Sequence, residues 1–178
     1  MALRSVLTLC RVLALVSVGF CASATGQEIL SAHDREDILK TVSAITAAIL
    51  SENVDELLHH ISITQGLRCT DTNYSYKSIQ GFLADKRSHL YMALFDSPLF
   101  SRECSGQYSL EYPAISDREF LKTADASVTI TPDRKDWVEV TIKSPVPSHY
   151  PRQWYLHREG HTWKLAGDSL IIGNCSCG

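Results

Sequence analysis

Histidines and acidic residues are the side chains of this 178-residue chain that could transfer protons. In the first half of the chain the candidates are Asp37, His59, His60 and His89. Each falls in a stretch with helical periodicity, where such side chains usually belong to a solvated helix face. The sequence therefore assigns no catalytic residue and predicts no cofactor.

The histidine spacing also argues against a metal site. His59 and His60 are adjacent, so in a helix they point about 100° apart and cannot hold one ion together. His157 and His161 flank a predicted tight turn and should lie opposite each other, but two ligands are fewer than zinc requires. A Cys-x-Cys motif near the C-terminus could bind a soft metal and has the same shortage of ligands.

The N-terminal segment resembles a secretory signal peptide. Arg4 makes it positive, and its uncharged apolar run over residues 12–20 is shorter than the roughly 20 residues that span a bilayer. Small residues at 22–24 fit the site that a signal peptidase reads, so we expect cleavage after Ala24.

A lipid anchor on Cys21 is the alternative, and the bulky Phe20 before it argues against this reading. The sequence thus predicts a signal peptide over 1–24, followed by one α+β domain over 25–178. The expected location is periplasmic or secreted.

Four cysteines follow the predicted signal peptide: Cys69, Cys104, Cys175 and Cys177. An even number of cysteines in an exported chain predicts disulfide bonds. A bond between Cys69 and Cys104 would close a loop of about 35 residues and stabilise by a few kcal/mol. Either could instead pair with a C-terminal cysteine, and the sequence does not choose.

Composition makes several functions improbable. The chain has 17 basic and 20 acidic residues, a formal net charge of −3, and no basic stripe, so nucleic acid is not an expected partner. No segment after the N-terminal one is long and apolar enough to span a membrane. The sequence lacks the motifs typical of serine hydrolases, nucleotide-binding loops and zinc proteases.

Four segments show helix signals. Residues 31–50 start with a capping serine and then place apolar residues every three or four positions. Asn53 caps a short second helix. A third helix is predicted over Tyr76–Phe95 and should stop at Pro98, and a fourth follows the cap at Ser116.

From residue 127 the period changes to 2, which is typical of strands. Two strands are predicted on either side of a turn at 132–136, and a stiff loop over 144–151 leads to two more. Their connection is predicted to be a three-residue turn at 158–160, ending in a glycine, and 170–172 should be a last short strand. The residues predicted to face the core are Val128, Ile130, Val138, Val140, Ile142, Trp154, Leu156, Trp163 and Leu165.

Helices followed by strands predict an α+β fold, with a curved antiparallel sheet and the N-terminal helices packed on one face. The segment DREDILKTVSAITAAILSENVDELLHHIS (34–62) resembles the first helix pair of the NTF2-like (cystatin-like, SnoaL-type) superfamily. The segment WYLHREGHTWKLAGDSLI (154–171) resembles the last hairpin of that superfamily. The resemblance implies an NTF2-like roll, whereas residues 63–112 match no known pattern.

The superfamily includes isomerases, dehydratases, epoxide hydrolases, transport factors and binding domains, so its fold does not select a function. The predicted inner face of the strands contains no Asp, Glu or His, which is typical of a packed core or an apolar pocket. This favours an exported, non-catalytic domain that binds a small apolar ligand or a protein partner. The alternatives are a cofactorless lyase or isomerase with a helix-borne acid or base, and a periplasmic inhibitor or immunity protein.

Overall fold

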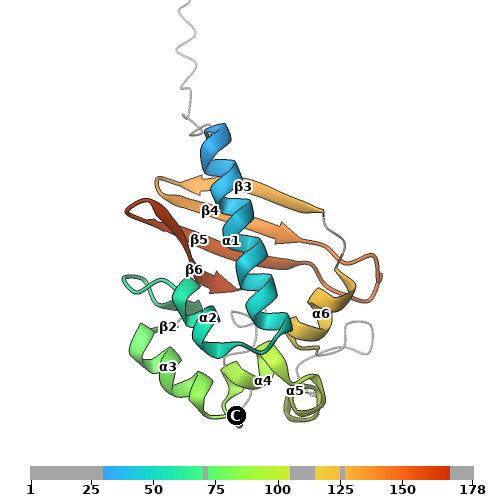
Figure 1. Ribbon diagram of the computed structural model, residues 1–178. Helices are drawn as coiled ribbons and strands as arrows, with labels where there is room; N and C mark the ends of the chain where they lie inside the picture. The colour runs from blue at the N-terminus through green and yellow to red at the C-terminus, as the bar shows by residue number, and fades with distance from the viewer. Residues whose placement is uncertain (1–29, 70–71, 105–114, 125–126, 169–178) are drawn as a thin grey trace, which may run out of the picture.

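Figure 1 shows the computed structural model, which describes residues 30–69, 72–104, 115–124 and 127–168. Over these residues the chain is α+β, with six helices and one six-stranded sheet, as predicted at the level of fold class. The predicted signal peptide and the predicted strand at 170–172 lie outside the described residues.

The first two helices agree with the prediction. Helix α1 (Ala32–Leu50) begins at Ser31 and α2 (Val54–His60) at Asn53, and each cap side chain accepts a backbone N–H of the first turn. The apolar positions of α1 form one buried stripe, consisting of Ile38, Val42, Ile45, Ala48 and Ile49.

The single helix predicted over Tyr76–Phe95 is wrong, because the segment forms two helices. Helix α3 (Tyr76–Ala84) ends before Asp85, and α4 (His89–Phe95) begins at Ser88, whose hydroxyl accepts a backbone N–H of α4. The apolar period continues across the break, whereas the polar side chains at its two ends stop one helix and start the next.

Pro98 does not stop the helical region either. It lies in the first turn of α5 (Ser97–Cys104), where the missing N–H of proline costs nothing. Asp96 separates α4 from α5, and its carboxylate accepts the N–H of Leu99 at 3.0 Å. The last helix, α6 (Asp117–Thr123), begins at Ser116 as predicted.

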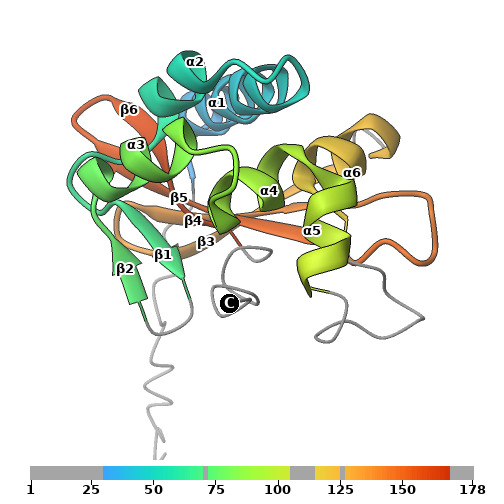
Figure 2. The same cartoon turned by 90° about the horizontal axis from the view of Figure 1, so that it is seen from below.

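The sheet has the strand order β2-β1-β6-β5-β4-β3. Its strands are β1 (Leu67–Cys69), β2 (Thr72–Tyr74), β3 (Val128–Arg134), β4 (Trp137–Ile142), β5 (Arg152–Glu159) and β6 (Thr162–Asp168). The prediction of an antiparallel sheet is wrong at one pair, since β1 runs parallel to β6 and the sheet is mixed. Figure 2 shows α1, α2 and α6 on the same side of this sheet.

Two predicted turns need correction. β3 continues through Pro132, which pairs with Val138, because β3 lies at the edge of the described sheet, where proline is tolerated. The β5–β6 turn has two residues rather than three, Gly160 and His161, because the strands continue to the paired residues at 159 and 162.

The predicted inner face is confirmed for its apolar residues, which are all buried except the half-buried Val128. The prediction that this face lacks acidic groups is wrong. Asp168 lies opposite Trp154 and Arg152 lies opposite Ile142, and both charged residues are buried. The register of β5 and β6 shifts between the pairs Leu156–Leu165 and Tyr155–Gly167, and a strict two-residue period does not foresee such a shift.

A single carboxylate ties the β5–β6 hairpin to the segment between α2 and β1. Glu159 accepts hydrogen bonds from Ser62 Oγ at 2.6 Å, from Thr64 N at 2.9 Å and from Ile63 N at 3.4 Å. Burial alone would raise the pKa of Glu159, but these hydrogen bonds outweigh it and lower the pKa to about 2. Glu159 is therefore ionised throughout the neutral range.

Candidate ligand-binding cleft

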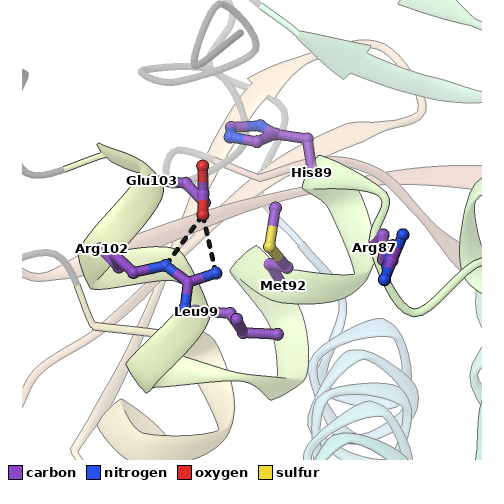
Figure 3. Close-up of a pocket in the computed structure, with 6 residues that line it drawn as sticks. All are labelled: Arg87, His89, Met92, Leu99, Arg102 and Glu103. Carbon is purple, nitrogen blue, oxygen red and sulfur yellow. Dashed lines mark hydrogen bonds and ion pairs between the residues drawn. The ribbon is translucent and has the colours of Figure 1, made fainter.

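Helices α4 and α5, together with the turn before α4, surround a cleft of about 650 Å³ (Figure 3). This volume lies in the range usual for sites that bind small molecules. Of the residues that the structure describes, Arg87, His89, Met92, Leu99, Arg102 and Glu103 line it.

The walls of the cleft are fixed by burial and by side-chain caps. The last six residues of α4, Leu90 to Phe95, are all buried, and Phe100 of α5 is fully buried. Ser88 caps α4, and its hydroxyl also donates to the carbonyl of Phe82 in α3 at 2.5 Å. With Asp96 capping α5, each of the two short helices is held at its N-terminus.

The lining combines an apolar part with charged groups. Met92 is buried and Leu99 is half-buried. Glu103 accepts hydrogen bonds from Arg102 Nε at 2.9 Å and Nη2 at 2.8 Å, as the dashed lines of Figure 3 show. The side chain of Arg87 makes no ion pair or hydrogen bond with any other residue that the structure describes.

His89 is the one candidate from the sequence that lines the cleft. Its ring lies 6.0 Å from that of Phe100, and burial lowers the pKa of its imidazole. His89 is therefore neutral at neutral pH and offers one hydrogen-bond donor and one acceptor.

The other three sequence candidates lie on different helix surfaces. Asp37 is 3.4 Å from His33 and 3.8 Å from Lys40, all on α1. His59 and His60 end α2 and both face the carboxylate of Glu56. These are pairs three or four residues apart within one helix, so they match the interpretation as solvated helix-face residues.

The structure does not bring His157 and His161 together as metal ligands, and the Cys-x-Cys motif lies outside the described residues. His157 lies opposite Lys164, and its ring packs against that of Trp137 in a tilted arrangement, with the ring centroids 4.7 Å apart. His161 is exposed in the turn, so the predicted facing of the two histidines is wrong. Across the described ranges, no three His, Cys, Asp or Glu side chains are placed to hold a metal ion.

The disulfide prediction stays open. Cys69 is the last residue of β1 and Cys104 is the last of α5, whereas Cys175 and Cys177 lie outside the described residues. The four candidate cysteines therefore remain candidates, with no pairing assigned.

A buried ion pair was missed by the sequence analysis. Arg152 Nε donates to Asp117 Oδ1 at 2.7 Å, its guanidinium stacks 4.6 Å from the ring of Phe120, and it also donates to the carbonyl of Ile115 at 3.0 Å. Neither charged residue lines the cleft. The pair joins α6 to β5, and nothing in the sequence pattern indicates that residues 35 apart would meet.

No protein-family model matches this chain, and no curated protein matches it. Of the helices that the structure describes, none combines the length and the apolar character needed to cross a bilayer. The case for a function therefore rests on the cleft.

Five of the six described lining residues were not singled out by the sequence. They lie in the segment 63–112, for which there was no family resemblance. The spacing of His89 and Met92, three residues apart, is the one usable signal, because such residues share a helix face. The packing of α5 near that face is a contact between separate helices, which local spacing does not predict.

Proposed function

We propose that this protein is an exported, non-catalytic binding domain that takes a small, largely apolar ligand into the α4–α5 cleft. The cleft itself is the observation that carries the proposal, because it joins a volume of about 650 Å³ to an apolar surface formed by Met92 and Leu99. By contrast, the inner face of the sheet is filled by its own side chains, with Trp154, Leu156 and Val140 each 0 % exposed.

A binding role is better supported than proton transfer. Within the described part of the lining, the titratable groups other than the arginines are His89 and Glu103, and Glu103 is held by Arg102. An acid–base enzyme would need a second group of matched pKa within reach of the same substrate atom. Asp37, His59 and His60 lie on α1 and α2 and do not line the cleft.

The proposal includes an NTF2-like fold. It is supported by the two segments that carry the resemblance, since 34–62 covers α2 and all but the first two residues of α1, and 154–171 covers most of β5 and all of β6. It also includes export, which is supported by the apolar run and small-residue site at the N-terminus. The intact mass of the exported protein tests export, with an N-terminus near Thr25 expected and a retained Met1 contradicting it.

The binding role is tested by filling the cleft. Leu99 is half-buried, so Leu99→Trp should occupy the cleft without disturbing the core. Native mass spectrometry of the protein purified from its producing cell should show a small-molecule adduct that the Leu99→Trp variant lacks.

Leu39→Trp is the matched control, because Leu39 is 43 % exposed on α1, far from the lining of the cleft in sequence. This variant should keep the adduct, and both variants should unfold at the denaturant concentration of the wild type. An adduct that survives Leu99→Trp, or its absence from the wild type, would contradict the proposed site.

A further inference from the structure

The lining of the cleft is more positive than the chain as a whole. Among the described residues, its charged groups are two arginines, Arg87 and Arg102, and one carboxylate, Glu103. With His89 neutral, this described part of the lining has an excess of one positive charge, whereas the chain has a formal net charge of −3. A concave site of this sign attracts anions.

The two arginines differ in what they already contact. Arg102 is held against Glu103 through Nε and Nη2. The side chain of Arg87 has no ion pair within the part of the chain that the structure describes, and its backbone N–H donates to Asp85 Oδ1 at 2.9 Å, which fixes the turn from which it extends. A guanidinium presents parallel N–H donors that match the two oxygens of a carboxylate.

Figure 3 places Met92 between these charged groups, with Arg102 on one side in this view and Arg87 on the other. A ligand that binds Arg87 and extends across the cleft towards Arg102 therefore also covers the apolar surface of Met92 and Leu99. A single excess positive charge matches a carboxylate better than a phosphate monoester, which has a charge of roughly −1.5 to −2.

We infer that the ligand is an amphipathic carboxylic acid, whose carboxylate is bound by Arg87 and whose hydrocarbon part lies against Met92 and Leu99. This inference rests on the proposed function, because it assigns a ligand class to the same cleft. Glu103 limits the affinity, since it neutralises Arg102 and so lowers the positive charge of the cleft.

The two methionines of the chain provide the readout. They are Met1 and Met92, so protein labelled with ¹³C in the methionine methyl groups reports on the cleft through one signal, which Met92→Leu assigns. The probes are octanoate, octan-1-ol and acetate. Octanoate has both a carboxylate and a hydrocarbon tail, octan-1-ol has the tail without the carboxylate, and acetate has the carboxylate without the tail. Octanoate should bind at least about tenfold more tightly than either of the others, because only it uses both surfaces.

Three variants test the charge assignment. Arg87→Gln should weaken octanoate binding about tenfold, the usual effect of losing a charged hydrogen bond, and should leave octan-1-ol binding unchanged. Glu103→Gln should strengthen octanoate binding about two- to fivefold, because the charge of Arg102 is then no longer neutralised. Arg35→Gln removes an exposed arginine of α1 outside the lining and should change neither.

The possible outcomes separate the inference from the function on which it rests. Equal binding of octanoate and octan-1-ol, with no effect of Arg87→Gln, overturns the carboxylate and leaves a binding cleft in place. Equal weakening by Arg87→Gln and Arg35→Gln also overturns it, because the effect would then be one of overall charge. If no probe shifts the Met92 signal, the inference and the proposed cleft both fail.

Discussion

The unit made of α1 and strands β3–β6 contrasts with the segment that contains α3, α4 and α5. In the first, elements of six to nineteen residues repeat one period often enough to form a continuous buried face. In the second, helices of seven to nine residues each have their own cap, and two of them leave a cleft between them. The comparison shows that long periodic elements close a core, whereas short capped ones leave room for a ligand.

The largest expected effect tests the closed unit. Trp163 is 4 % exposed, and the guanidinium carbon of Arg158 lies over its ring, 4.6 Å from the centroid. Trp163→Ala should therefore lower the free energy of unfolding by about 3–5 kcal/mol. His161 is exposed in the adjoining turn, and His161→Ala should cost about 0.5 kcal/mol or less. Urea denaturation measures both, and similar losses would mean that the strand faces are assigned wrongly.

Two glycines test how tightly the middle segment is built. Gly66 has φ +66°, and a Cβ there would lie 1.9 Å from the carbonyl oxygen of Tyr74, so Gly66→Ala should destabilise by about 2–4 kcal/mol. A Cβ at Gly81, inside α3, meets nothing within 4 Å, so Gly81→Ala should stabilise by about 0.5–1 kcal/mol.

Thermal and chemical denaturation of the two glycine variants give the sign of each change directly. A stabilising Gly66→Ala would show that the β1–β2 pair is not placed against residue 66 as described.

Glu159 connects the two regions and gives a pH dependence. Its folded-state pKa is about 2, below the ordinary value of 4.5, so its contribution to stability is complete above about pH 4.5 and is lost as the pH falls towards 2. Glu159→Gln should lower the free energy of unfolding at pH 7 by about 1–3 kcal/mol and flatten its decline between pH 4.5 and 2.

Glu36→Gln, on the exposed surface of α1, is the matched control. It should leave the decline of the free energy of unfolding between about pH 4.5 and 2 nearly unchanged. Chemical denaturation at intervals across this pH range measures all three proteins. If the free energy of unfolding falls with pH in the same way for the wild type and Glu159→Gln, Glu159 does not link the hairpin to the segment at 62–64.

The smallest expected effect compares two caps. Asp96→Ala removes the cap of α5 and Ser31→Ala removes that of α1, and each should cost about 1 kcal/mol. The long α1 keeps its place through five buried residues, whereas α5 has eight residues in all. Only Asp96→Ala should therefore shift the Met92 methyl signal, and an equal shift from both variants would contradict the idea that caps shape the cleft.

The sequence was sufficient where a pattern repeats within one element. The stripe from Ile38 to Ile49 and the alternation around Val140 predicted both α1 and the buried face of the strands. It failed at 85–88, where two polar caps interrupt a helix whose apolar period continues. It failed again at Asp168, where a change of register in the β5–β6 pair places an acid on the apolar face.

The amino-acid sequence alone determined the fold class, the faces of the long elements and the helix caps at Ser31, Asn53 and Ser116, because these depend on residues within a few positions of one another. Only the tertiary structure decided which short helices face each other and which charges meet. Arg152 and Asp117, Glu159 and Ser62, and the walls of the cleft are joined by packing between distant segments, and the free energy of such contacts depends on geometry that no local period encodes.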